Sequence, residues 1–230
     1  MKDIERYRHE LKYPISYIQY LAIRQRLCTI MLPDPHATDN GQYLIRSIYF
    51  ETPDDKALRE KIYGVSKREK FRIRYYNDDL SFIQLEKKMK HNNLCLKLET
   101  TLTEAEVRAL LAGKLSWMLS HPSEIVRELY CKMKSQQLFP CVVVSYLREP
   151  YIYTPGNVRV TFDKEIRTSL YRRTFLEESA SDVSATDTPG QIIMEVKYDE
   201  YMPDIITCLL QTEGVRQSAF SKYGVCRRFG

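Results

Sequence analysis

Charged side chains stand at every second position in several segments of the chain, and apolar residues separate most of them. Successive side chains of a β-strand point to opposite faces of the sheet, so each set lies on one face of its strand. The pattern therefore predicts strands with one charged face and one apolar face. The sets are Arg8, Glu10 and Lys12; Arg72 and Arg74; Glu86 and Lys88; Arg159 with Thr161 and Asp163; and Glu195 and Lys197.

The charged face has two interpretations. A half-exposed antiparallel sheet has one wet face, but such a face would mix Ser, Thr, Gln, Glu and Lys freely. Here Arg and Lys recur on strand after strand, and like charges on neighbouring strands repel each other by a few tenths to ~1 kcal/mol per pair. A sheet that gathers cations in this way needs an anion. If the sheet closes into a barrel, its charged face lines a lumen that suits a linear polyanion. The planar guanidinium group of arginine can donate two parallel hydrogen bonds to phosphate, so phosphate is the favoured anion.

Composition limits how phosphate could be bound. The chain has 230 residues, of which 43% are hydrophobic, and a net charge of +5, which suits one large domain or two small ones. It contains neither a GxxxxGK[ST] nor a GxGxxG sequence. A phosphate ligand would therefore be bound by Lys and Arg side chains, not by a backbone loop. The six cysteines are scattered without the spacing of a zinc site.

No apolar stretch approaches the ~18 residues that a membrane-spanning helix needs. The charged N-terminus lacks the apolar core of a signal peptide, so we expect a cytoplasmic protein. Arg227 and Arg228 form part of a basic tail over 221–228, which we expect to be solvated and not to bind nucleic acid.

Strands outnumber helices in the predicted secondary structure, and there is no βαβ alternation. This pattern favours an α+β domain built around an antiparallel sheet. A capping box formed by Thr103 and Glu106 predicts the start of a helix that Gly113 ends. Residues 177–190, rich in Ser, Asp and Thr, are predicted to be a mobile loop. The predicted strands cover 7–13, 43–50, 71–76, 81–89, 94–99, 141–147, 151–154, 157–162 and 191–198, and the other helices 16–31, 53–63, 123–135 and 204–211.

Seven short blocks, in order and spread over nearly the whole chain, resemble the VTC domain. This is the polyphosphate polymerase domain of the triphosphate tunnel metalloenzyme (CYTH-like) superfamily, here of the bacterial type. The resemblance implies an eight-stranded antiparallel β-barrel that forms a basic tunnel flanked by helices, with residues 1–230 as a single domain. The blocks are RHELKY at 8–13, RSIYFE at 46–51, FRIRYY at 71–76, LEKK at 85–88, VRV at 158–160, IMEVK at 193–197 and FSKY at 220–223.

The resemblance also implies site residues. Those expected to bind the reacting phosphates are Lys12, Arg72, Arg74, Lys88, Arg148, Arg159 and Lys222. Further phosphate contacts are expected from Lys61, Lys97, Lys197, Arg8 and Arg216. Lys61 stands where the family has an arginine, and Arg216 would supply a charge that the family places at the position of Ala219. Glu195 matches the metal-binding glutamate, and Glu10 and Glu86 are further candidate ligands for Mn²⁺ or Mg²⁺.

The implied reaction moves the terminal phosphoryl of ATP onto phosphate or a growing polyphosphate chain. The nucleophile is already anionic, so catalysis requires positioning and charge neutralisation and no general base.

Two alternatives stay open. The first is a tunnel triphosphatase that hydrolyses tripolyphosphate or nucleoside triphosphates. Tunnel triphosphatases have an ExExK first strand, whereas Arg8 replaces the first carboxylate here, which weakens a two-metal site. A binding module for polyphosphate or inositol polyphosphate that lost turnover would explain Ala219. Any membrane partner would be a separate chain, and the sequence does not reveal the oligomeric state.

Overall fold

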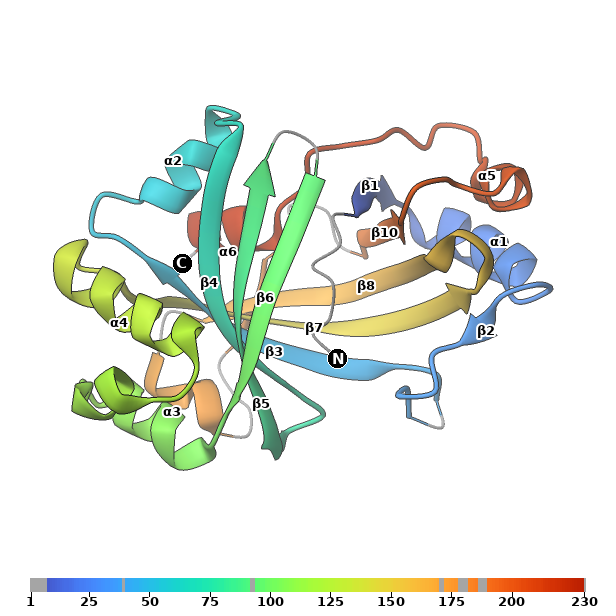
Figure 1. The fold of residues 1–230 in the computed structure, drawn as a ribbon. Helices are drawn as coiled ribbons and strands as arrows, with labels where there is room; N and C mark the ends of the chain where they lie inside the picture. The colour runs from blue at the N-terminus through green and yellow to red at the C-terminus, as the bar shows by residue number, and fades with distance from the viewer. Residues whose placement is uncertain are drawn as a thin grey trace.

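The computed structural model describes residues 8–38, 40–91, 94–169, 172–177, 182–185 and 190–229. These residues form one antiparallel sheet whose main path has the strand order β1-β10-β8-β7-β3-β4-β5-β6, with β2 beside β7 and β9 beside β8 (Figure 1). The strands are β1 (His9–Ile15), β2 (Leu32–Pro33), β3 (Tyr43–Glu51), β4 (Lys67–Tyr76), β5 (Asp79–His91), β6 (Leu94–Leu102), β7 (Phe139–Tyr153), β8 (Val158–Ser169), β9 (Val183–Ser184) and β10 (Ile192–Tyr198).

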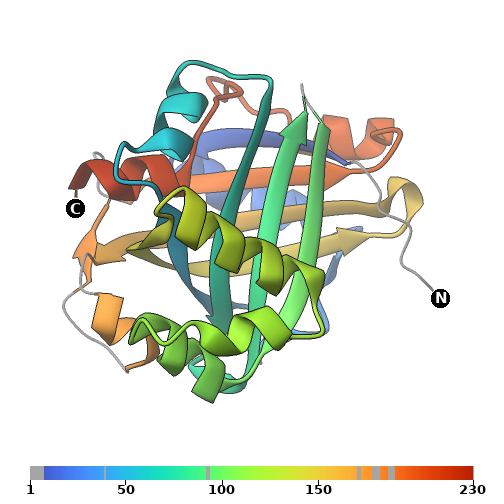
Figure 2. The ribbon, with the colours of Figure 1, turned by 60° about the vertical axis from the view of Figure 1, so that its left-hand side comes forward.

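The sheet curls until its two edge strands meet. β4, β5 and β6 cross in front of β7, β8 and β10, which lie on the far side of the barrel (Figure 2). The edges β1 and β6 join at one bridge, where the backbone N–H of Arg8 donates to the carbonyl of Cys95 at 3.4 Å. The predicted α+β tunnel fold is therefore present as a curled sheet whose edges touch at this single bridge in the described part of the chain.

Helices cover the outside of the curled sheet because its outer face is apolar. Ile73 and Leu85 on β4 and β5 pack with Val107 of α3 and Val126 of α4. α1 and α5 cover the outer side of β10 and β8, and α6 packs beside β3 and β7. The charged side chains of the same strands consequently face inward. The helices are α1 (Tyr17–Leu27), α2 (Lys56–Ile62), α3 (Glu104–Leu111), α4 (Glu124–Ser135), α5 (Asp204–Leu210) and α6 (Lys222–Phe229), and the short 3₁₀ segments are η1 (Ser116–Ser120), η2 (Pro155–Asn157) and η3 (Arg172–Leu176).

Most predicted elements are present, with longer strands. The capping box of Thr103 and Glu106 forms as expected and starts α3. The two strands predicted over 141–147 and 151–154 are one strand, β7, because Pro150 keeps its place opposite Thr161 in the ladder. Of the predicted loop over 177–190, residues 178–181 and 186–189 lie outside the described residues.

The prediction of a solvated tail over 221–228 is wrong for most of these residues, although Arg228 is exposed as expected. These residues contain helix α6, whose buried Tyr223 and Cys226 pack with β3 and β7. The guanidinium Nε of Arg227 lies 3.1 Å from a carboxylate oxygen of Asp55. The helix was not predicted because most of its residues are charged, aromatic or glycine, and it brings Lys222 to the tunnel lining.

Candidate functional site

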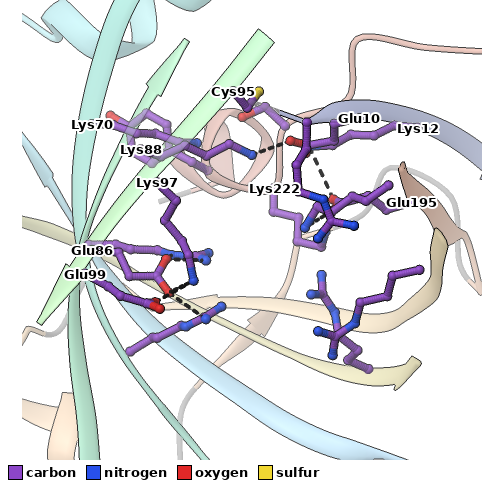
Figure 3. A pocket seen from close by; sticks show the side chains of 18 of the residues that line it. Glu10, Lys12, Lys70, Glu86, Lys88, Cys95, Lys97, Glu99, Glu195 and Lys222 are labelled. Carbon is purple, nitrogen blue, oxygen red and sulfur yellow. Dashed lines mark hydrogen bonds and ion pairs between the residues drawn. The ribbon is translucent and has the colours of Figure 1, made fainter. Parts of the chain in front are cut away.

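The curled sheet encloses a cavity of about 530 Å³ lined mainly by charged side chains (Figure 3). Almost all of the residues predicted as a site lie around it, although they come from separate strands and from α6. The predicted residues that line it are Arg8, Glu10, Lys12, Arg72, Arg74, Glu86, Lys88, Lys97, Arg148, Arg159, Glu195, Lys197 and Lys222.

Two predicted site residues, Lys61 and Arg216, do not line this cavity. Lys61, on α2, lines an adjoining cavity of about 440 Å³ that opens from one end of the tunnel. Ala219 lines the same adjoining cavity. Arg216 is exposed and lines neither cavity, so the structure does not place it where it could replace a lysine at position 219.

One wall of the tunnel holds a carboxylate between two arginines. The Glu86 side chain is 1% exposed, and its oxygens lie 2.7 Å from Arg72 Nη2 and 2.6 Å from Arg74 Nη2. Burial alone would raise the pKa of Glu86, but Arg72 and Arg74 outweigh it and lower this pKa to about 2. Lys97 Nζ lies 3.7 Å from the same carboxylate. Glu86 thus holds both arginines in fixed orientations toward the lumen.

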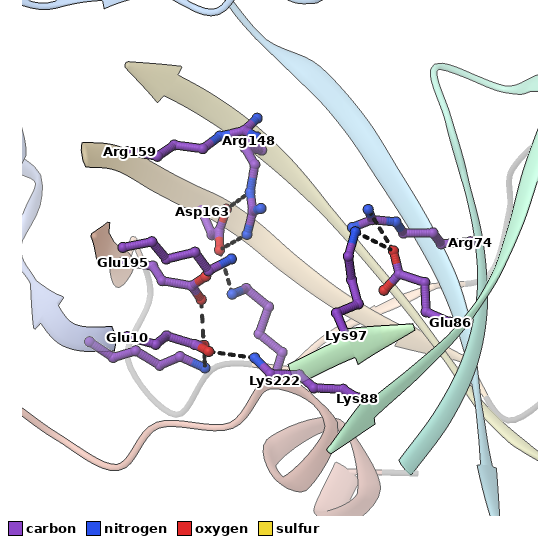
Figure 4. A network of polar contacts seen from close by, with 12 residues as sticks. Glu10, Arg74, Glu86, Lys88, Lys97, Arg148, Arg159, Asp163, Glu195 and Lys222 are labelled. Atoms are coloured by element: carbon purple, nitrogen blue, oxygen red, sulfur yellow. Dashed lines mark hydrogen bonds and ion pairs between the residues drawn. The ribbon is translucent and has the colours of Figure 1, made fainter. Parts of the chain in front are cut away.

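The opposite wall has a second buried carboxylate, Asp163 (Figure 4). Arg148 donates to both oxygens of Asp163, at 2.7 and 2.8 Å, and Lys222 forms an ion pair with it. Burial acts to raise the pKa of Asp163, but Arg148 and Lys222 hold it below the usual range. At the rim of this wall, Arg159 donates to Asp34 at 2.5 Å and to the Tyr43 hydroxyl at 2.8 Å.

Two glutamates on β1 and β10 approach each other around one lysine. Lys12 Nζ lies 2.9 Å from Glu10 Oε1 and 3.6 Å from Glu195 Oε2. Lys88 pairs with Glu10, and Lys197 lies 2.6 Å from Glu195. Burial acts to raise both glutamate pKa values, but the surrounding lysines hold both well below the usual range. Both carboxylates are therefore ionised at neutral pH.

Glu10 and Glu195 fit a divalent cation better than Glu86 does. Mg²⁺ and Mn²⁺ commonly take one or two carboxylates and complete their coordination with water and substrate phosphates. No group of three or more His, Cys, Asp or Glu side chains suited to a metal occurs among the described residues, so the substrate would have to supply ligands. Glu86 faces Glu195 across the lumen, and its oxygens are held by arginines (Figure 4).

Lys70 lines the tunnel but was not among the predicted site residues. It precedes Arg72 and Arg74 at the same strand spacing, so the alternation could have identified it. Its Nζ lies 5.1 Å from the centre of the Tyr49 ring and 5.8 Å from that of Tyr223. Burial lowers the pKa of Lys70 to about 8, with only Tyr49 acting to raise it among the main contributors. The lining tyrosines Tyr43, Tyr49, Tyr76, Tyr146 and Tyr223 also escaped prediction.

Binding of a polyanion should be coupled to proton uptake. Burial lowers the pKa of Lys197 to about 8 as well, against the opposing effect of Glu195. Above about pH 8 these two lysines lose protons in the free protein, whereas a bound polyphosphate favours their charged forms. Each coupled proton lowers the affinity for tripolyphosphate about tenfold per pH unit above that pKa. Calorimetry in buffers of different ionisation enthalpy should show uptake that Lys70→Gln reduces, and equal heats in all buffers would contradict this.

The family model of the VTC domain matches residues 7–229. No curated protein is similar to the chain. Solved structures that share its fold include the following two. A putative adenylate cyclase from Bacillus halodurans has 18% identity and a TM-score of 0.51, with 90% of this chain and 87% of that one covered. The Hippeastrum protein HpAC1, described as a putative adenylyl cyclase with a dominant triphosphatase activity, has 14% identity and a TM-score of 0.56, with 98% and 96% covered.

These likenesses confirm the tunnel fold. In the described part of the chain, no helix combines the length and the apolar character that crossing a membrane requires.

Proposed function

The chain belongs to the VTC domain family, and we propose that it is a polyphosphate polymerase that moves the terminal phosphoryl of ATP onto phosphate or polyphosphate inside the tunnel. The observation that carries the proposal is the excess of cations on the tunnel wall. The lining cations are Arg8, Lys12, Lys70, Arg72, Arg74, Lys88, Lys97, Arg148, Arg159, Lys197 and Lys222, and the lining carboxylates are Glu10, Glu86, Glu99 and Glu195.

The tunnel wall also has buried arginine N–H groups without a hydrogen-bond acceptor in the described part of the chain. The Nε atoms of Arg74 and Arg159, which line the tunnel, are buried without a hydrogen-bond partner among the described residues. Such groups are rare in folded proteins, because each costs about 1–3 kcal/mol when left unpaired. Arg74 and Arg159 lie on opposite walls (Figure 4). A phosphate chain between these walls would offer acceptors to both.

The proposed reaction needs positioning and neutralisation of charge. An oxygen of the acceptor phosphate forms a bond to the terminal phosphorus of ATP, the bond from that phosphorus to the bridging oxygen breaks, and ADP leaves. The acceptor oxygen is already anionic, so no proton has to be removed. Arg72, Arg74 and Arg148 are fixed by carboxylates, so they can bind non-bridging oxygens without reorienting as charge develops.

Glu10 and Glu195 would hold the divalent cation in this proposal. Both carboxylates are ionised and in contact with Lys12, and their side chains are 9% and 5% exposed, respectively. Bound Mn²⁺ or Mg²⁺ would neutralise charge on the phosphates of the substrate.

Hydrolysis of tripolyphosphate or of a nucleoside triphosphate is the second candidate, because HpAC1 shares the fold. The first strand weighs against it. Arg8 occupies the position of the first carboxylate in the triphosphatase ExExK strand, and its Nε lies 2.8 Å from Asp199 at the rim. The carboxylates Glu10 and Glu195 then remain as candidates for one cation, not for a two-metal site.

Product analysis tests the proposal directly. The purified chain is incubated with ATP labelled in the terminal phosphoryl, with Mn²⁺ or Mg²⁺, and the products are separated by length. We expect labelled polymer and ADP. Labelled free phosphate as the sole product would establish a triphosphatase, and unchanged ATP together with tight polyphosphate binding would establish a binding module.

A further inference from the structure

At the tunnel end next to α2, cations lie opposite one another on neighbouring strands. Arg68 on β4 lies opposite Lys90 on β5. Two residues further along β4, on the same face of the sheet, Lys70 lies opposite Lys88. Like charges directly opposite in a sheet are destabilising. The following pair is Arg72 with Glu86, of opposite charge. The repulsive pairs are therefore confined to one end of the tunnel.

The outermost cations have no carboxylate to offset them. No ion pair joins Lys61, Arg68 or Lys90 to an acidic residue within the described ranges, and Arg68 donates only to the carbonyl of Val65. Glu69 lines the same cavity, but its carboxylate is held by Lys87, at 3.0 Å, and by Lys132.

Glu10, the other carboxylate there, is engaged by Lys12 and Lys88. The outermost cations are thus the part of the wall whose charge is least compensated. Arg68 and Lys90 act with burial to lower the pKa of Lys61, as expected for a lysine among cations.

This end is continuous with the tunnel. The adjoining cavity of about 440 Å³ shares Lys12, Lys70 and Lys88 with the tunnel lining. Figure 3 shows Lys70 and Lys88 together at one end of the cavity, away from Glu86 and Glu99. A linear anion in the tunnel could therefore continue past Lys70 toward Arg68, Lys90 and Lys61 without leaving a cationic surface.

We propose that Lys61, Arg68 and Lys90 form an outer basic site, which binds the segment of a polyphosphate chain that extends beyond the tunnel. The inference rests on the proposed function for its choice of ligand. A short anion such as tripolyphosphate fits within the tunnel and does not need the outer basic site. A long chain occupies both regions, so its affinity gains from contacts that a short one cannot make.

The test compares chain lengths. Affinities for tripolyphosphate and for a polyphosphate several times longer are measured by calorimetry, without ATP or metal, for wild type and for Arg68→Gln/Lys90→Gln. We expect the affinity of the variant for the long chain to fall at least about tenfold, which corresponds to about 1.4 kcal/mol. Its affinity for tripolyphosphate should stay within about twofold of wild type, and the salt dependence of long-chain binding should weaken by about one to two charges.

The matched control is Lys114→Gln/Lys134→Gln, which removes the same charge from exposed residues away from both cavities. This control should bind both chains as wild type does. Equal losses for the two chain lengths in Arg68→Gln/Lys90→Gln, or no loss for either, would overturn the proposal. So would loss of binding to vesicles of anionic lipid with unchanged polyphosphate affinity, which would assign the site to a membrane surface. This experiment measures binding and not turnover. A protein without polymerase activity would therefore contradict the proposed function, but the difference in affinity between long and short chains would still test the outer basic site.

Discussion

Replacing Arg72, Arg74 and Glu86 together by glutamine should abolish phosphoryl transfer and leave the fold intact. Under the proposed function the two guanidinium groups bind phosphate oxygens, and the Glu86 carboxylate fixes the orientation of both. Removal of one preorganised charge-stabilising donor typically lowers kcat by 10²–10³, so loss of both should lower activity by at least about 10³. The triple variant removes both positive charges and the carboxylate that pairs with them, so no isolated charge stays buried.

The double variant Arg72→Ala/Arg74→Ala should behave differently. From the sequence alone, loss of two mutually repelling cations is expected to leave stability unchanged or raised. The structure contradicts this expectation because Glu86 lies between them with 1% of its side chain exposed. Without its arginines, this carboxylate keeps, among the described residues, only the ion pair with Lys97 at 3.7 Å. Leaving a buried charge uncompensated costs about 3–5 kcal/mol, so the double variant should melt well below wild type.

Thermal unfolding with and without tripolyphosphate separates these effects. Wild type should gain stability from the ligand because the ligand binds the folded state. The triple variant should melt close to wild type without ligand and gain little from it. A triple variant that keeps the full ligand-induced shift and wild-type turnover would show that these arginines do not bind the phosphates.

The fold was predictable because the alternation of charged and apolar residues along a strand indicates which face of the strand is buried. Phe71, Ile73 and Tyr75 on β4 are buried in the apolar core outside the sheet, and Arg72 and Arg74 between them face the lumen. The resemblance supplied the eight-stranded barrel around a tunnel, which alternation alone could not, whereas the strand order came only from the structure. The helical character of 222–229 was missed because most of its residues are charged, aromatic or glycine, with no clear apolar stripe.

The pairing of charges within the site was not predictable. Alternation places Lys12 and Glu195 on one face of their strands, but only the register of β1 against β10 sets them opposite each other. Asp163 belongs to the charged set on β8 but was not selected, and its role as the partner of Arg148 depends on the β7–β8 register. Lys70 was overlooked because the resemblance highlighted only the two arginines that follow it.

Glu195→Gln should abolish metal-dependent turnover and retain polyphosphate binding. Glu195 lies among Lys12, Lys197 and Lys222, and its ionised carboxylate is one of two that could hold the cation. Glutamine has nearly the same shape but no charge, so the lumen becomes more positive. Affinity for tripolyphosphate should therefore stay or rise, while turnover with Mn²⁺ or Mg²⁺ falls at least about hundredfold.

Glu99→Gln provides the matched control for this experiment. Glu99 also lines the tunnel, but it pairs with Lys97 at 2.5 Å and its side chain is 40% exposed. The same loss of one negative charge at this position should change turnover by less than about tenfold, because a metal held by Glu10 and Glu195 would be undisturbed. If charge alone governed turnover, the two variants would behave alike. Full activity of Glu195→Gln with Mn²⁺ would show instead that the cation is held elsewhere. Both variants remove one negative charge from the lumen, so a much larger loss of turnover in Glu195→Gln would show that the position of the carboxylate, and not the lumen charge alone, governs turnover.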